Sequence, residues 1–513
     1  MRKRAKLWTE RRLTLQIPAA VKWIAPIAIA GLILWLVVDA CHQESGTTAA
    51  VTPGSTSKAS RTVPATATSV PELPSVGMAV AEPTPPSQVY VVQSGDTLGG
   101  IAARFGCQVD AIIRANRIAN PNVLSVGQQL EIPSPQMETG PAAQLLPDSE
   151  FVNGPAYVDF DIAAFVADQG GYLANYSENV GGEVLSGAEI VRLVAHHYSV
   201  GPRLLLAMVE LKGGWVTNSS PAVAALGANG SRSNLFSQQL AWAADQLNKG
   251  YYDWRGRGME LITWDDGTTT CYASNLNAGT AGLQYFLSLY ATKSQWATWV
   301  GDGPDSLIGT YRSLFGDPAK YAVQPLIPAD LANPALSLPW AKGETWHFTG
   351  GPHGAWEDGS AWAALDFVPT GGPFGCALPP SFAAAAAPGL VIYSQKGEVL
   401  VDLDKDGHEE TGWVLFYLHM AGDGRVPFDT EVKQGDPIGH PSCEGGFSES
   451  SHLHFARKYN GEWIAAGGPL PFMLSGWQAH SSGTDYDGTM TRGGQTVTAS
   501  ESWNAQVNGL TSD

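Results

Sequence analysis

An apolar run near the N-terminus, Val21 to Ala40, constrains this chain more than any other feature, because its only charges are Lys22 and Asp39. About 20 such residues cross the core of a bilayer as a helix. The run follows a basic head that contains Arg2, Lys3, Arg4, Lys6, Arg11 and Arg12. Because basic flanks stay in the cytoplasm, we expect a cytoplasmic segment 1–20, a single transmembrane helix 21–40 and all later domains outside the cytoplasm.

Two alternatives to this membrane anchor stay open. The run also fits a long signal peptide that is cleaved near Ala40. A lipoprotein signal with acylated Cys41 is the second alternative, but Asp39 stands where that signal has a small or apolar residue. We favour the retained anchor.

The chain is too long for one core, since 513 residues correspond to about three domains. Its formal net charge of −18 argues against nucleic acid as a partner, because phosphate binding requires a positive surface. Segment 41–87 is rich in Pro, Thr and Ser and predicts a disordered spacer. Prolines also punctuate Pro325 to Pro339, a second linker. We therefore place folded domains at 88–134, 150–322 and 338–480, followed by a C-terminal tail, 481–513.

The first of these domains predicts a strand, two helices and a strand within 88–134. Its motifs are Tyr90-Val91-Val92-Gln93-Ser94-Gly95-Asp96-Thr97-Leu98, then Asn116, and finally Val126 to Pro133. The segment resembles a LysM module over its whole length. The resemblance implies that it binds N-acetylglucosamine-containing glycan, with Gly95, Asp96, Thr97 and Leu98 at the binding loop.

The middle domain, 150–322, predicts a mostly helical fold. Apolar residues recur at three- and four-residue spacing over 188–197, 202–211 and 238–247. The run Val200 to Trp215 resembles the lysozyme-like fold of lytic transglycosylases. In that register Lys212 takes the place of the acid glutamate, and a lysine cannot serve as the carboxylic acid of a glycosidase. Glu210 lies about 200° around the helix from that position. We therefore expect this domain to be catalytically inactive.

The last domain predicts strands at Gly389–Tyr393, Val399–Val401 and Trp413–Tyr417. His452 and His454 lie two residues apart in a further apolar strand, so both side chains point to one face. Two imidazoles side by side in an apolar strand suggest a metal or catalytic site.

The surroundings of this pair resemble lysostaphin-like zinc peptidases of the LytM type, which have an antiparallel β fold. The matching motifs are Leu365-Asp366-Phe367, Ala387 to Val391, Tyr417-Leu418-His419-Met420, Gly435 to Gly439 and Ser451-His452-Leu453-His454-Phe455. The resemblance implies that Asp366 and His454 are Zn²⁺ ligands and that His419 and His452 are catalytic. Three protein ligands leave one position of a zinc ion open for reaction, which suits hydrolysis.

The first histidine ligand departs from the family pattern. Four residues before Asp366, where the family has this ligand, the chain has Trp362. We expect His353 to replace it, with an insertion over 355–361, and His347 is the alternative.

Two side features accompany the predicted zinc site. The resemblance places Cys376 and Cys443 beside the groove, where a disulfide would brace the loops, whereas Cys107 and Cys271 have no evident partner. Asp402, Asp404 and Asp406 alternate before a glycine, as at the start of a Ca²⁺ loop. A complete loop would have glutamate where Trp413 stands, so an acidic turn between two strands explains them slightly better.

These features predict a zinc endopeptidase that cuts peptide cross-links of bacterial peptidoglycan, anchored in the cell membrane and bound to wall glycan through its LysM module. Two alternatives remain. A non-catalytic wall-binding regulator is favoured by Trp362, and a bifunctional enzyme with transglycosylase activity is favoured by the middle domain.

Overall fold

The computed structural model describes residues 88–513, except 94–95, 106–108, 117, 119–123, 133–137, 227–233, 260, 373–374 and 503. The predicted cytoplasmic segment 1–20, transmembrane helix 21–40 and spacer 41–87 lie outside the described residues. Within the described part, no helix is long and apolar enough to cross a membrane.

The N-terminal unit has the predicted order of strand, helix, helix and strand: β1 (Gln88–Val91), α2 (Leu98–Phe105), α3 (Val109–Asn116) and β2 (Gln129–Ile132). The two strands pair antiparallel, with Gln88 opposite Ile132. The Asn116 amide donates to the Glu131 carbonyl and accepts from the Glu131 N–H, so α3 is fixed to the closing strand.

The middle domain is mostly helical, as predicted. Its three predicted helices form α6 (Gly187–Tyr198), α7 (Pro202–Gly213) and α8 (Phe236–Tyr252). Ser186 and Glu189 cap α6 reciprocally, and Pro202 occupies the first turn of α7. The other helical elements are α4 (Asp148–Phe151), η2 (Pro155–Tyr157), α5 (Ile162–Gln169), η3 (Tyr172–Asn175), η4 (Asp253–Arg257), α9 (Ala278–Ser288), α10 (Lys293–Trp299), α11 (Leu307–Phe315) and η5 (Pro318–Tyr321). Short strands accompany them: β3 (Glu138–Thr139), β4 (Ser177–Val180), β5 (Glu183–Ser186), β6 (Leu261–Thr263) and β7 (Thr269–Cys271).

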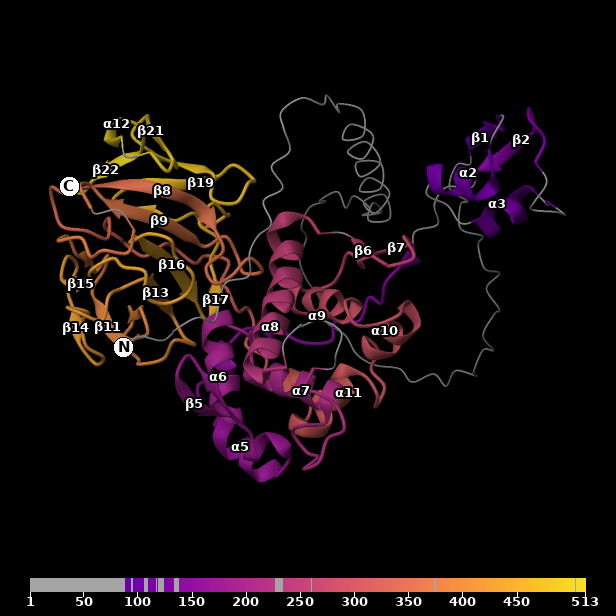
Figure 1. Cartoon of the computed structure of the whole chain (residues 1–513), viewed down its shortest axis with the longest axis horizontal. Helices are drawn as coiled ribbons and strands as arrows, with labels where there is room; N and C mark the ends of the chain where they lie inside the picture. Colours follow the sequence, from indigo (N-terminus) through magenta and orange to yellow (C-terminus); the bar gives the residue numbers. More distant parts are fainter. Residues whose placement is uncertain are drawn as a thin grey trace, which may run out of the picture. The chain divides into compact units, whose positions relative to one another are not determined.

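The C-terminal domain is built on a nine-stranded antiparallel sheet with the order β14-β11-β12-β13-β16-β9-β8-β22, in which β17 also pairs with β16. Figure 1 shows β8, β9, β16 and β13 in this order. The strands are β8 (Thr345–His353), β9 (Ala364–Pro369), β11 (Gly389–Gln395), β12 (Glu398–Asp402), β13 (Trp413–Leu418), β14 (Glu431–Val432), β16 (Leu453–Tyr459), β17 (Glu462–Trp463) and β22 (Gly509–Thr511). A separate pair consists of β10 (Ala383–Ala384) and β15 (Pro437–Gly439).

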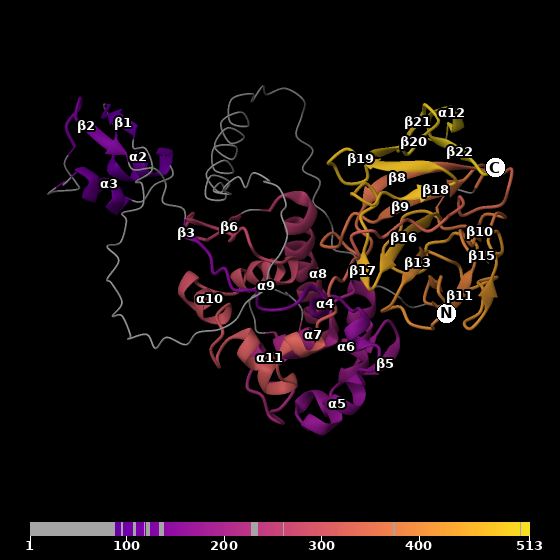
Figure 2. The ribbon, with the colours of Figure 1, turned by 180° about the vertical axis from the view of Figure 1, so that it is seen from behind.

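The segment after residue 480 is not a separate tail, which corrects the predicted boundary. Strands β18 (Met473–Leu474), β19 (Trp477–Ser481), β20 (Gly488–Arg492) and β21 (Gln495–Thr498) form a second sheet, and helix α12 (Ala505–Asn508) leads into β22. Strand β22 pairs with β8, with Leu510 opposite Trp346. Both ribbon views show this second sheet beside β8 (Figure 1 and Figure 2). The C-terminal residues therefore complete the domain.

One hydrophobic core runs from the middle helices into the main sheet. It joins Ala195 and Tyr252 of the helices with Phe416, Ala456 and Trp463 of the sheet. The Tyr252 hydroxyl also accepts a hydrogen bond from the Trp463 N–H at 3.1 Å. The two domains therefore share a packed interface.

A buried ion network crosses this interface. His196 of α6 lies 2.6 Å from Glu409 and 3.2 Å from Glu398, and Lys458 lies 3.1 Å from Glu409. Burial acts to lower the pKa of His196, but the charges of Glu409 and Glu398 outweigh it and raise that pKa to about 9. Contacts with His197 and His196 overcome burial for Glu398, and contacts with His196 and Lys458 overcome it for Glu409, so the pKa of each carboxyl group is lowered to about 2.

We expect His196→Ala to destabilise the chain in a pH-dependent way. The raised pKa means that charged His196 stabilises the fold fully below its ordinary pKa of 6.5 and loses this effect as pH rises through about 9. The two carboxylates stabilise it above their ordinary pKa of 4.5 and lose this effect as pH falls through about 2. The variant should therefore lose about 3 kcal/mol of unfolding free energy near pH 5.5 and much less at pH 10, measured by urea unfolding. His408→Ala, outside the network, is the control; an equal loss at both pH values would contradict the assignment.

Candidate metal centre

Three neighbouring strands bring together His353, Asp366 and His454. His353 ends β8, Asp366 lies in β9 and His454 lies in β16. Asp366 is opposite His454 on one side and opposite Gly350 on the other, so β9 is the middle strand. All three side chains are buried. Burying such polar groups is costly unless they have partners.

The three side chains converge on one point. His353 Nε2 lies 3.1 Å from His454 Nδ1 and 3.3 Å from Asp366 Oδ1, and His454 Nδ1 lies 3.3 Å from the same Oδ1. Asp366 Oδ1 is fully buried and has no hydrogen-bond partner. The site therefore gathers three potential ligand atoms around one small space.

The remaining ring nitrogens determine which atoms face this space. His353 Nδ1 lies 2.8 Å from the Gly351 carbonyl, and His454 Nε2 lies 3.0 Å from the Ala355 carbonyl. A carbonyl can only accept, so each of these nitrogens carries the proton and donates it. In the neutral rings, His353 Nε2 and His454 Nδ1 consequently present lone pairs toward Asp366. A histidine that binds a metal through one ring nitrogen typically donates a hydrogen bond from the other nitrogen, and this bond fixes the orientation of the ring.

These three acceptors fit a divalent metal ion. A proton shared between His353 Nε2 and His454 Nδ1 would leave Asp366 Oδ1 without a partner. One metal ion bound between the three atoms satisfies all of them. Tetrahedral coordination with bonds of about 2.0–2.1 Å separates its ligand atoms by about 3.3 Å. The observed separations of 3.1, 3.3 and 3.3 Å agree with this geometry.

Electrostatics inside the cluster favour the ionised carboxylate. Burial acts to raise the pKa of Asp366, but His353 and His452 beside it hold that pKa well below its usual range. Burial lowers the pKa of His454, so this ring is neutral and able to act as a ligand. For His353 burial acts to lower the pKa, but the charge of Asp366 outweighs it and raises that pKa.

His419 and His452 lie beside the cluster of His353, Asp366 and His454. Their ring centroids are 4.5 Å apart. His419 Nδ1 donates to the Glu444 carbonyl at 3.0 Å, and His452 Nδ1 donates to the Ser450 carbonyl at 2.9 Å. The Nε2 atom of each ring is therefore left as the acceptor, and His452 Nε2 lies 3.6 Å from Asp366 Oδ1.

The backbone and pKa of His419 both indicate a specialised position. His419 follows β13 with φ 65°, a left-handed conformation that costs about 1–2 kcal/mol for a non-glycine residue. Burial is the main cause that lowers the pKa of His419 to about 3, and the neighbouring His452 and His454 act in the same direction. This imidazole is therefore neutral and can accept a proton.

The structure places His353, and not His347, with the other two predicted ligands. His347 lies on the same strand, but its Nδ1 bonds to Asn508 Oδ1 at 2.9 Å and its Nε2 to Thr370 Oγ1 at 3.3 Å. Trp362, at the family's ligand position, lies under the Arg257 guanidinium, 5.5 Å from it. The chain between His353 and Ala364 forms a loop, as the insertion predicts.

Cys376 and Cys443 form the predicted disulfide. Next to it, the Ser451 N–H donates to the Gly375 carbonyl and the Ser451 hydroxyl donates to the Ala377 carbonyl. This bracing fixes the segment that leads into His452. Cys271 is also disulfide-bonded, so the expectation that it has no partner was wrong.

The acidic turn has an internal explanation. Asp402 accepts from the N–H groups of Asp404 and Gly407, and Asp406 accepts from the N–H of His408. These carboxylates close the turn, and the prediction of Ca²⁺ at Asp402, Asp404 and Asp406 has no support beyond their proximity to one another.

The predicted glycan-binding residues divide into different roles. Asp96 accepts from the Tyr90 hydroxyl and the Gln93 N–H, and Thr97 accepts from the Gly100 N–H, so both organise the loop. Leu98 is 4% exposed in the core of the unit, which corrects its assignment as a contact residue. Gly95 lies outside the described residues. Glycan binding through this loop stays a prediction.

In the middle domain, the two residues weighed as catalytic have structural partners. Lys212 Nζ lies 4.0 Å over the Trp299 ring and 4.7 Å over the Tyr290 ring. Glu210 accepts from the N–H groups of Val216 and Thr217 and so closes the turn after α7. The predicted inactivity of this domain is compatible with these contacts but is not tested by them.

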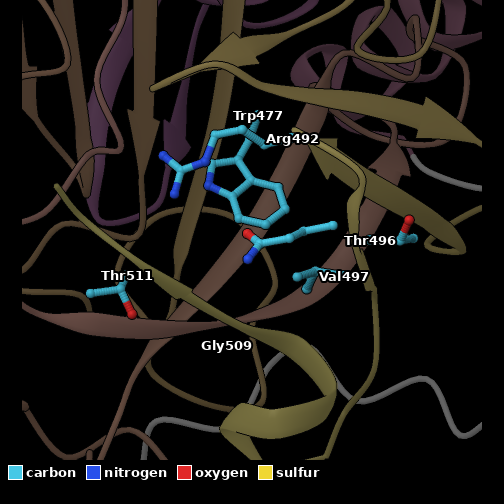
Figure 3. A pocket seen from close by; sticks show the side chains of 7 residues that line it. Trp477, Arg492, Thr496, Val497, Gly509 and Thr511 are labelled. Carbon is cyan, nitrogen blue, oxygen red and sulfur yellow. The ribbon is translucent and has the colours of Figure 1, made fainter.

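A pocket on the C-terminal strands is separate from the cluster. Figure 3 shows it between Trp477, Arg492, Val497 and Thr511, and no residue of the cluster lines it.

The backbone carbonyls of Gly351, Ala355 and Glu444, which accept hydrogen bonds from the histidines, could not be predicted from the sequence. Every residue has a backbone carbonyl, so the residue type does not reveal which one lies beside a histidine.

Comparisons with known proteins agree with this arrangement. The family described as "LysM domain" matches residues 90–133, and the family described as "LasA, N-terminal domain" matches residues 144–329. Protease LasA of Pseudomonas aeruginosa is 28% identical over 364 residues, which cover 66% of this chain and 78% of the relative.

Two further proteins are each similar to about one third of this chain. The beta-lytic metalloendopeptidase of Achromobacter lyticus is 26% identical over 187 residues, covering 34% of this chain and 44% of that protein. The solved structure of the M23 metalloprotease pseudoalterin from the deep sea is 24% identical, with a TM-score of 0.28, and covers 33% of this chain and 96% of its own.

The antiparallel fold and the His/Asp/His cluster define a metal-dependent endopeptidase. The matched segments make the chain similar to protease LasA over about two thirds of its length, and residues 90–133 match the LysM family.

Proposed function

We propose that this chain is a zinc endopeptidase that hydrolyses peptide cross-links of bacterial peptidoglycan. The observation that carries this proposal is the convergence of His353 Nε2, Asp366 Oδ1 and His454 Nδ1 at mutual distances of 3.1–3.3 Å. One carboxylate and two imidazoles are a ligand set that suits zinc. When bound, zinc supplies Lewis acidity toward a peptide carbonyl and a lowered pKa for water.

The protein's own residues then handle the proton. His419 Nε2 is the acceptor of a neutral ring, held by the hydrogen bond from Nδ1 to the Glu444 carbonyl. His452 Nε2, beside it, is held in the same way by the Ser450 carbonyl. We assign these rings to taking a proton from the attacking water. The ring that has taken up the proton then becomes a donor, which can stabilise the oxyanion and pass the proton to the leaving amine.

The LysM module supports peptidoglycan as the substrate polymer, because a second binding site on the same polymer raises the effective concentration of the catalytic domain. The disulfide between Cys376 and Cys443 supports a location outside the cytoplasm, where thiols are oxidised. A retained membrane anchor at 21–40 is part of this proposal and rests on the sequence alone.

The alternative of a non-catalytic regulator was motivated by Trp362 at the family's ligand position. Because His353 lies beside Asp366 and His454, a tryptophan at position 362 is no longer a reason to expect an incomplete ligand set. The alternative of a glycosidase rests on the middle domain, where Lys212 stands at the acid position and packs on Trp299.

Digestion of purified peptidoglycan by the full chain in detergent separates these functions. We expect new amino groups, released from cut peptides, that disappear with a zinc chelator and return when zinc is added back. Anhydro-sugars in the products would instead indicate a transglycosylase. The absence of both products from a zinc-loaded preparation would reject the endopeptidase.

A further inference from the structure

The insert loop, which we define as residues 354–363, lies between ligand strands β8 and β9. It starts directly after His353 and ends three residues before Asp366. Its Ala355 and Ala361 are buried and joined by a backbone hydrogen bond of 3.0 Å. The loop is therefore folded and packed, with metal-site residues close to both ends.

The insert loop also contacts the third member of the cluster. The Ala355 carbonyl accepts the hydrogen bond from His454 Nε2 at 3.0 Å. This bond decides that Nδ1 of His454, and not Nε2, faces Asp366. A shift of Ala355 would free the His454 ring to rotate or change its tautomer. The position of one backbone carbonyl in the loop thus controls one ligand atom.

The middle domain holds the far side of the insert loop. Asp245 Oδ1 of α8 accepts from the Gly359 N–H at 2.8 Å. The Arg257 guanidinium of η4 donates to the carbonyls of Gly359 and Ser360 at 3.3 and 3.5 Å. A Cβ atom on Gly359 would come within 2.0 Å of the Asp245 carbonyl oxygen, so the loop and α8 are in direct backbone contact.

An aromatic contact adds a second connection. The His197 ring of α6 stacks on Trp356 of the insert loop, with centroids 4.0 Å apart and planes at 21°. Trp356 packs edge-on against Phe416, and Phe416 in turn packs edge-on against the His454 ring. The middle domain therefore reaches the cluster by two routes, one polar and one apolar.

We propose that the middle domain is a positioning element of the metal centre. Through Asp245, Arg257 and His197, it fixes the insert loop so that the Ala355 carbonyl orients His454 for metal binding. These are positioning residues, because they act through the loop. The inference rests on the proposed function in one respect, namely that the cluster binds zinc.

The test compares Asp245→Ala with Asp245→Asn in the full chain. The alanine variant loses the acceptor for the Gly359 N–H, whereas asparagine keeps an oxygen acceptor of the same reach. Zinc affinity is measured by competition with a chromogenic chelator. We expect a loss of about 10-fold or more for Asp245→Ala, the effect typical of groups that orient ligands, and near wild-type affinity for Asp245→Asn. Arg312→Ala, an exposed residue of α11, is the control.

Each outcome decides the proposal. Wild-type zinc affinity in folded Asp245→Ala would overturn it, with the fold judged by circular dichroism. If that variant does not fold, Arg257→Ala takes its place. It removes the two longer hydrogen bonds to the loop, the contact with the Trp362 ring and the ion pair with Asp253. A wild-type chain that binds no zinc would reject the proposed function together with this inference, whereas tight binding by all variants would reject the inference alone.

Discussion

We expect His454→Ala to abolish zinc binding and to lower kcat/KM on peptidoglycan peptides by about 10³-fold or more, because zinc contributes several kcal/mol to the transition state. His454 Nδ1 is one of only three converging atoms in the cluster, so its loss leaves His353 and Asp366 as an incomplete set. Metal content by mass spectrometry and the release of amino groups measure the two effects. We expect His353→Ala to behave in the same way.

His347→Gln is the matched control, since His347 lies on the same strand and was the alternative ligand. Its ring bonds to Asn508 and Thr370, and a glutamine retains hydrogen-bonding groups there. This variant should bind zinc as the wild type does. Loss of zinc in His347→Gln with retention in His353→Ala would reverse the assignment of the first ligand.

Sequence periodicity was sufficient for much of this site. A period of two placed His452 and His454 on one face, and the structure has both rings near Asp366 Oδ1. His353 was harder, because β8 contains two irregularities between Phe348 and His353 where its register with β9 shifts. Such bulges change which residue faces the site, and no local pattern in the sequence reveals how many residues they displace.

Long-range contacts are the other part that the sequence did not reveal. Strand β22 has three residues, too few for a periodic signal, and it is held by pairing with β8. The polar contacts between α6 and the main sheet join His196 with Glu398 and Glu409, more than 200 residues apart. Each of these residues alone fits an exposed helix or turn, and only the tertiary fold gives them partners. The boundary between middle and C-terminal domains was therefore predicted as a linker, whereas the domains share a core.

His419→Ala, in contrast to His454→Ala, should keep its zinc and lose activity. His419 is not among the three converging atoms, so metal content stays at the wild-type level. Its neutral ring presents Nε2 as a proton acceptor, and the loss of a general base typically costs about 10²–10⁴-fold in kcat. The decrease should appear in kcat more than in KM, because the proton is transferred in the transition state and not in the substrate complex.

His440→Ala provides the comparison for this last effect. His440 is a nearby histidine that contacts the Phe382 ring and is hydrogen-bonded to the Ser381 carbonyl, and the mechanism gives it no part. It should retain both zinc and rate. Because His419 adopts φ 65°, alanine at this position also keeps the strained backbone, and the melting temperature of the variant shows whether the turn survives. A folded, zinc-loaded His419→Ala variant with the wild-type kcat would exclude His419 as the base, and His452, whose Nε2 faces the same side, would then be the group that accepts the proton.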